Sequence, residues 1–189
     1  MKFFIKLIRK TKSNILPLSK NKIIISRSII IMKRSPFLET LSWEHHDGLV
    51  LAFRIEKGIQ KQVDAQTIRE YVLHVWKNEL VHHFWQEEQS LIDPLQEMDD
   101  GKRLVNKMLD HHQHIENQIE TIRQSAPISN ATLREFANFL NKHIRFEERE
   151  LFPFIEHNVQ EARLNRIKTF LNRHHEPGSK EWKVHFWKD

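Results

Sequence analysis

The chain has 189 residues, enough for one well-filled domain and too few for two comfortable ones. It contains no cysteine, which excludes disulfides, thiolate metal sites and cysteine nucleophiles. With only four Gly and six Pro, and with frequent Leu, Ile, Glu and Lys, the composition favours an all-α fold.

The charge is very unevenly distributed. The formal net charge is +5, but residues 1–34 hold ten Lys and Arg and no Asp or Glu. The remaining residues carry 20 basic against 25 acidic side chains. A nucleic-acid surface needs a basic face on the folded domain, so we expect no nucleic-acid partner.

Residues 1–33 form a basic, apolar leader. It is either a targeting or membrane-surface segment, or sequence upstream of a true start at Met32. We favour the second, because Met32 falls just before the first well-formed helix signal. No apolar run approaches the length of a membrane span. We therefore expect no integral membrane segment and a cytoplasmic protein.

Capping residues and prolines predict where the helices begin. Ser35 followed by Pro36 indicates the start of the first helix, and Thr-x-x-Glu capping boxes at Thr67 and Thr132 indicate the starts of the second and fourth. The expected ranges are 36–60, 67–94, 101–124, 132–157 and, for a shorter polar helix, 161–173. Four long helices with short loops predict an up-down-up-down four-helix bundle with a short extra C-terminal helix.

We expect the bundle to occupy residues 34–175, followed by an aromatic tail over residues 176–189. The tail contains Trp182, Phe186 and Trp187. These side chains either cap one end of the bundle, which we favour, or dock a partner.

The second and fourth helices share one pattern, sixty residues apart. Its copies are Leu73, Trp76, Leu80, His83, Glu87, Glu88, Leu91 and Leu133, Phe136, Leu140, His143, Glu147, Glu148, Leu151. Steps of three and four put all of these except Glu88 and Glu148 on one helical stripe. Because a carboxylate on a core-facing stripe is costly without a partner, the pattern indicates a bound metal. Glu88 and Glu148 either support the ligand histidines or lie on a solvated edge.

The first and third helices each add a histidine pair, His45-His46 and His111-His112. In the third helix His112 continues the apolar stripe, so we choose it over His111. In the first helix the apolar stripe centres on His45, whereas the His-x-x-Leu/Ile spacing shared with the third helix selects His46. We choose His46, and keep His45 and His111 as the alternatives.

The predicted ligands are therefore four histidines and two glutamates: His46, His83, Glu87, His112, His143 and Glu147. Imidazole and carboxylate together suit iron, manganese or zinc. Because two carboxylates can bridge two ions, the ligand set favours a pair of metals. A single metal ion is the alternative.

These motifs resemble the hemerythrin-like (HHE cation-binding) family over roughly residues 33–157. The resemblance implies a four-helix bundle around a non-haem di-iron centre (two Fe) that meets dioxygen, peroxide or nitric oxide. Oxygen carriers of that family have His-x-x-x-His on the third helix and His-x-x-x-x-Asp on the fourth. Here the spacings are His112-x-x-x-Glu116 and His143-x-x-x-Glu147. These departures favour the branch whose members sense, store, scavenge or repair over plain oxygen carriage.

Three functions follow as hypotheses. The first is a di-iron protein that binds or senses dioxygen, peroxide or nitric oxide. The second is a di-iron enzyme that reduces peroxide or nitric oxide, or donates iron for iron–sulfur repair, with an unidentified redox partner. The third is a structural or regulatory helical bundle with zinc or no metal.

Overall fold

The structure is a computed structural model that describes residues 36–176 and 182–188. The predicted leader and the predicted Ser35 cap lie outside these residues. Within the described ranges all regular secondary structure is helical and no strand occurs, which confirms the all-α prediction. None of the described helices is both long enough and apolar enough to cross a lipid bilayer.

Seven α-helices are described. They are α1 (Glu39–Gln60), α2 (Ala65–Val75), α3 (Val81–Leu95), α4 (Asp99–Gln124), α5 (Asn130–Phe146), α6 (Phe152–Asn158) and α7 (Glu161–His174). Two single turns of π-helix, η1 (Trp76–Leu80) and η2 (Glu147–Leu151), join α2 to α3 and α5 to α6 without a break. The described chain therefore forms four long helical segments followed by α7.

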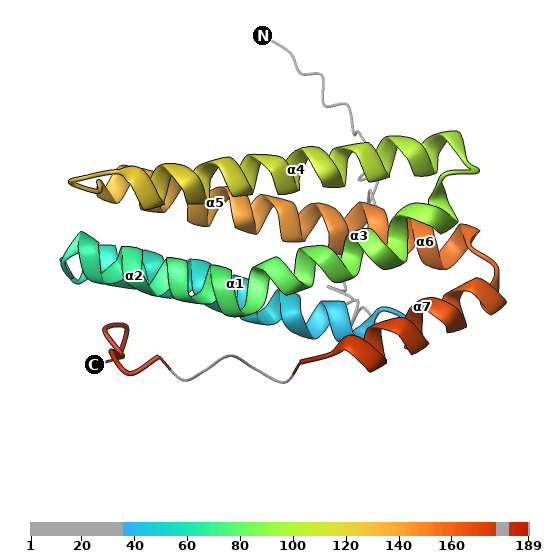
Figure 1. Cartoon of the computed structure of the whole chain (residues 1–189), viewed down its shortest axis with the longest axis horizontal. Helices are drawn as coiled ribbons and strands as arrows, with labels where there is room; N and C mark the ends of the chain where they lie inside the picture. Colours follow the sequence, from blue (N-terminus) through green and yellow to red (C-terminus); the bar gives the residue numbers. More distant parts are fainter. Residues whose placement is uncertain (1–35, 177–181, 189) are drawn as a thin grey trace, which may run out of the picture. The chain divides into compact units, whose positions relative to one another are not determined.

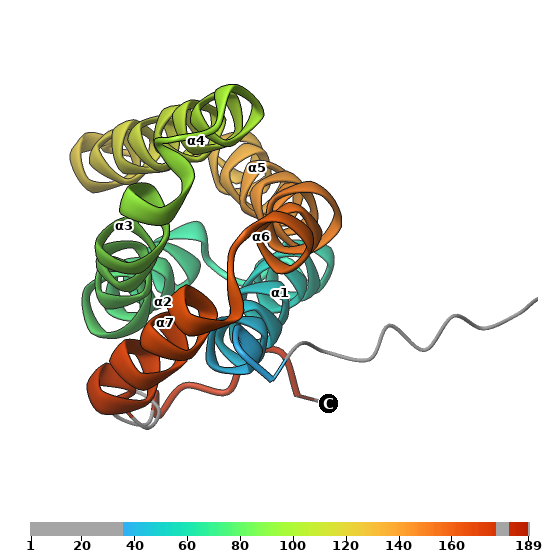
Figure 2. The same cartoon turned by 90° about the vertical axis from the view of Figure 1, so that its right-hand side faces the viewer.

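The four long segments lie beside one another as a helical bundle. In Figure 1 the chain reverses direction at the short connections 61–64, 96–98 and 125–129. Seen end-on, the long segments surround a common interior, and α7 lies outside it against α1 and α3 (Figure 2). Each long segment can therefore present one stripe of side chains to the same interior.

The predicted helix starts need correction. α2 begins at Ala65 and α5 at Asn130, so both capping-box threonines lie inside a helix. The cap of α5 is Ser129, whose side-chain oxygen accepts a hydrogen bond from the backbone N–H of Thr132 at 3.1 Å. Ser129 takes this position because an N-cap hydroxyl satisfies the N–H three residues further along. The first helix likewise begins at Glu39 rather than at Pro36.

The interior contains two apolar clusters. One includes Ile55, Ile119 and Phe136, and the other includes Leu41 and Met108, with every long segment contributing to both. Fully burying one such side chain contributes roughly 1.5–3 kcal/mol, so the clusters supply the main driving force for bundle assembly. Along each long segment, the buried histidines and glutamates lie close to the point where the residues of one cluster give way to those of the other.

Gly48 lets α1 approach α5 closely. A Cβ atom at this position would lie 2.8 Å from Cδ1 of Ile144. The glycine is one turn beyond His45, so the close approach falls at the level of the polar residues.

The aromatic tail packs against the bundle. Trp182, Phe186 and Trp187 surround Tyr71 with ring centres 5.0–5.6 Å away. Arg54 donates a hydrogen bond to the Tyr71 hydroxyl at 2.7 Å and lies 4.1 Å from a ring centre of Trp187. The described tail residues thus cover part of the apolar cluster that contains Ile55.

Candidate metal centre

Histidine and glutamate side chains meet in the bundle interior. His45 and His112 are 2% exposed, and Glu87, His143 and Glu147 are 0% exposed. Charged side chains are almost never buried to this extent without partners. Their burial between two apolar clusters marks this level of the bundle as a specialised site.

The π-helical turn η1 sets which residues of the second long segment face the interior. Val75 and Leu80 are buried in succession, a step of five residues, because η1 adds one residue to the turn. Leu73 and Trp76, which the repeat pattern placed on the buried stripe, are consequently only partly buried. The two copies of the sequence pattern therefore differ in burial: Leu133 and Phe136 are buried, whereas the matching Leu73 and Trp76 are only partly buried.

The second π-helical turn begins at one of the glutamates. Glu147 is the first residue of η2, and its carbonyl accepts the backbone N–H of Phe152, five residues on. π-helical turns often occur at functional sites. Here η2 carries the chain from Glu147 into α6 while keeping Leu151 and Phe152 buried.

The polar residues form two potential metal-binding groups. The first comprises His45, His83, Glu87 and Glu147; the second comprises Glu87, His112, His143 and Glu147. Within each group one ligand atom from every residue lies within 4.8 Å of all the others. Glu87 and Glu147 belong to both groups, so two carboxylates connect two histidine pairs.

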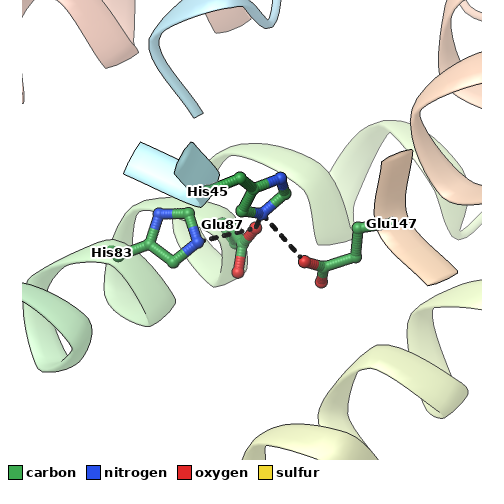
Figure 3. A group of neighbouring side chains, drawn as sticks. All are labelled: His45, His83, Glu87 and Glu147. Atoms are coloured by element: carbon green, nitrogen blue, oxygen red, sulfur yellow. Dashed lines mark ion pairs between the residues drawn. The ribbon is translucent and has the colours of Figure 1, made fainter. Parts of the chain in front are cut away.

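Figure 3 shows the first group, with side chains from α1, α3 and η2 turned toward one another. Nε2 of His45 lies 3.4 Å from Glu87 Oε1 and 3.1 Å from Glu147 Oε2. Nε2 of His83 lies 3.4 Å from the same Glu87 oxygen. The imidazole nitrogens that converge on the carboxylates are thus both Nε2, a nitrogen through which histidine commonly binds metals.

Several of these buried atoms lie close together yet have no hydrogen bond to any residue in the described part of the chain. They are Nε2 of His45 and His143, Oε1 of Glu87 and both carboxylate oxygens of Glu147. Leaving buried polar atoms without hydrogen bonds costs about 1–3 kcal/mol each. A cation would satisfy them all at once, so the donor set fits a metal centre.

In three of the histidines, the other ring nitrogen, Nδ1, contacts a carboxylate. Nδ1 of His45 lies 2.8 Å from Glu148, Nδ1 of His83 lies 2.8 Å from Glu44, and Nδ1 of His112 lies 2.8 Å from Glu88. Such pairs fix the imidazole orientation and leave Nε2 free to bind a metal. Glu148 and Glu88 therefore contact histidines of the cluster. This agrees with the interpretation that these glutamates support the histidines.

Sequence reasoning did not assign a role to Glu44. Its position one residue before the His45-His46 pair carried no distinguishing signal, because it contacts a histidine on another helix. Glu44 also contacts Nδ1 of His175 at 3.1 Å. Burial raises the pKa of Glu44, but the hydrogen bonds and charges of His83 and His175 outweigh it and lower that pKa overall.

Without a cation the two central carboxylates differ in their affinity for protons. Burial raises the pKa of Glu87, but His83, His112 and His45 outweigh burial and hold that pKa well below its usual value. Burial and the charge of Glu87 raise the pKa of Glu147 to about 7. The histidines therefore stabilise Glu87 as a carboxylate, whereas Glu147 takes up a proton more readily.

The histidines respond to the same carboxylates. Burial lowers the pKa of His112, but contacts with Glu87 and Glu88 outweigh it and raise that pKa to about 10. For His45 the contacts with Glu147, Glu148 and Glu87 likewise outweigh burial, and the pKa is raised well above the ordinary value. Both imidazoles therefore attract a proton in the absence of a metal, which indicates a strongly cation-favouring field.

The structure corrects the choice of histidine on the first helix. His45 is in the cluster, whereas His46 is exposed and in neither group. Adjacent residues differ by about 100° around a helix, so only one of the two can face the interior. The apolar stripe through Leu41 and Ala52, which favoured His45, was the better guide than the spacing shared with α4.

On α4 the structure brings His112 into the cluster and leaves His111 beside it. The ring centre of His111 lies 5.8 Å from that of His143, and Nδ1 of His111 is buried without a hydrogen bond within residues 36–176 and 182–188. Burial and the charges of Lys142 and Lys107 lower the pKa of His111 to about 4. His83, Glu87, His143 and Glu147 are all in the cluster.

Fold and site together define a metal-binding helical bundle: an all-helical protein with a buried histidine–glutamate cluster suited to a cation. Residues 38–155 match the model of the hemerythrin HHE cation-binding domain. That match spans most of the chain and all of the cluster. The chain therefore belongs to the hemerythrin HHE cation-binding family, which confirms the resemblance seen in its motifs. Neither a curated protein nor a solved structure matches it.

Proposed function

We propose that this protein holds two metal ions, iron in the cell, at the buried cluster and uses them to bind or sense dioxygen, peroxide or nitric oxide. The observation that carries the proposal is the sharing of Glu87 and Glu147 between two groups that each add two histidines. Shared carboxylates are the ligand pattern of paired metals in helical bundles.

The six side chains would have distinct roles. Glu87 and Glu147 would bridge, His45 and His83 would serve one ion, and His112 and His143 the other. Each ion would then have four protein ligand residues, fewer than the six ligands of an octahedral ion. When bound, iron supplies open positions and redox chemistry for a small oxidant.

The rest of the chain would tune that centre. Glu44, Glu88 and Glu148 orient His83, His112 and His45 through the contacts at 2.8 Å. The apolar clusters on either side limit water at the centre. A water-poor site of this kind favours a small uncharged ligand such as dioxygen or nitric oxide. We further propose that the protein acts in the cytoplasm.

Metal stoichiometry tests the proposal. Protein purified without an affinity tag should contain two metal ions per chain, as measured by mass spectrometry of the elements. Glu147→Gln should remove both ions, because both groups share this residue, whereas His143→Ala should remove one. His157→Ala, an exposed histidine on α6, is the matched control and should retain both. Fewer than one ion per chain in the unaltered protein would sink the proposal.

The identity of the metal and its ligand is tested by optical spectra. Protein prepared without oxygen and then exposed to air should gain a near-ultraviolet charge-transfer band if the ions are iron. The spectrum should also change on addition of peroxide or nitric oxide. A colourless protein that contains zinc in both states would contradict the iron assignment.

A further inference from the structure

We propose that a hollow on the outer surface of α4, α5 and η2 binds a small oxyanion of the phosphate class. The hollow has a volume of about 440 Å³ and is lined in part by His111. It uses none of the proposed metal ligands. The proposal is therefore independent of whether the cluster holds iron.

The lining of the hollow is strongly basic. Four cationic side chains, Lys107, Lys142, Arg145 and Arg149, line it together with one carboxylate, Glu150. Outside residues 1–34 the chain carries only 20 basic against 25 acidic residues. A gathering of four cations on an otherwise acidic body creates a local positive potential that attracts anions.

Most of that charge is available to a ligand. Lys107 contacts Glu150 at 2.9 Å and lies 4.1 Å from the ring centre of Phe146, so its charge is partly compensated. Among the described residues, the Lys142 ammonium lies 5.3 Å from the ring centre of Phe139 and makes no side-chain ion pair. Arg145 donates a hydrogen bond to Oδ1 of Asn141 at 2.7 Å. Arg149 makes no ion pair or side-chain hydrogen bond within residues 36–176 and 182–188. Guanidinium and ammonium groups held around one hollow are the donors that phosphate oxygens prefer.

A buried imidazole supports the assignment independently of the surface charge, because Nδ1 donates a hydrogen bond in the tautomer that carries its proton there. His111 lines the hollow, is only 8% exposed, and its Nδ1 has no hydrogen bond to any described residue. The rings of Phe139 and Phe146, each 5.2 Å away, hold the imidazole in place from two sides. Asn138 and Asn141 add amide groups to the same lining. A tetrahedral oxyanion offers enough acceptors for the imidazole, the amides and the cations together.

The test is calorimetric titration of the metal-loaded full chain with inorganic phosphate, at an ionic strength held constant with sodium chloride. We expect saturable binding of one phosphate per chain. Lys142→Gln combined with Arg149→Gln should weaken it by about tenfold or more, since two charge-assisted contacts are lost. Lys77→Gln combined with Arg173→Gln removes the same charges from exposed positions elsewhere and should leave the affinity unchanged.

Two results would overturn the proposal. One is the absence of saturable phosphate binding, and the other is an equal loss in the two double variants, which would show attraction to net charge alone. Phosphate could also bind a metal ion, and this case is distinguishable. Binding that survives Lys142→Gln/Arg149→Gln but disappears in Glu147→Gln would assign the phosphate to the metal centre and contradict the hollow.

A second titration identifies the source of the phosphate group. Ribose 5-phosphate binding more tightly than inorganic phosphate would indicate a phosphorylated small molecule, and the reverse order would indicate the free ion. The metal content of Lys142→Gln/Arg149→Gln should equal that of the unaltered protein, because neither residue is in the histidine–glutamate cluster.

Discussion

Nδ1 of His45 lies 2.8 Å from Oε1 of Glu148, which also accepts a hydrogen bond from the Ser42 hydroxyl at 2.8 Å. The contact joins α1 to η2 and turns Nε2 of His45 toward Glu87 and Glu147. It thereby holds the His45 imidazole in the orientation that the cluster needs.

The two histidines of α1 form a matched pair of variants. His45→Ala should lower the metal content from two ions per chain to one, because His45 belongs to only one of the two groups. His46→Ala should leave both ions in place, since His46 is exposed. Elemental analysis after identical purification measures both. Loss of metal in His46→Ala but not in His45→Ala would contradict the structure.

Glu148 should affect metal affinity without binding metal itself. Glu148→Ala removes the acceptor that orients His45, and losses of this kind weaken metal binding by about 10–100-fold. Competition with a chelator of known affinity measures the change. The control is Glu156→Ala on α6, an exposed glutamate, which should bind metal as the unaltered protein does. Equal metal affinities for Glu148→Ala and Glu156→Ala would show that Glu148 does not orient His45 for metal binding.

Metal removal should destabilise the bundle. A ligand that binds only the folded state stabilises it by about 2.7 kcal/mol at a free concentration 100 times its Kd, and the carboxylates left behind are buried together. Thermal unfolding, followed by circular dichroism with and without a chelator at constant pH, should show a lower midpoint after chelation. The difference in midpoint with and without chelator should be smaller for Glu147→Gln, because this variant is expected to bind less metal. An unchanged midpoint in the unaltered protein would mean that the cluster holds no tightly bound metal.

The end of α1 offers a stability prediction unrelated to metal. Gln62 has φ of 57°, and the N–H groups of Val63 and Gln62 bond the carbonyls of Gly58 and Ile59 at 3.0 and 3.1 Å. This is a Schellman helix end, in which the left-handed position usually holds glycine. A left-handed residue other than glycine costs roughly 1–2 kcal/mol, so Gln62→Gly should stabilise the fold by about 1 kcal/mol after its entropic cost.

The control for that variant lies two residues earlier. Gln60 is an exposed helical residue at the end of α1, where glycine costs about 1 kcal/mol. The denaturant concentration at the unfolding midpoint should therefore rise for Gln62→Gly and fall for Gln60→Gly. A destabilising Gln62→Gly would mean that its side chain contributes contacts that outweigh the backbone strain.

The approximate positions of the helices and the His83–Glu87 and His143–Glu147 pairs could be recognised in the sequence because these are local properties. Hydrophobic periodicity predicts helices, and residues four apart lie on one face whatever the helix packs against. The helix starts were less accurate, since Ser129 and Asp64 rather than Thr132 and Thr67 precede α5 and α2. Several residues near a helix start can cap it, and local sequence does not rank them.

The amino-acid sequence by itself determined an all-helical, cation-binding chain with a histidine–glutamate pair on each of two helices. Only the tertiary structure decided that His45 rather than His46 faces the interior, that η1 turns Leu73 and Trp76 partly away from it, and that Glu44 contacts His83. These outcomes depend on how far each helix is rotated about its axis. That rotation is set by packing against residues distant in sequence, such as Ile144 against Gly48.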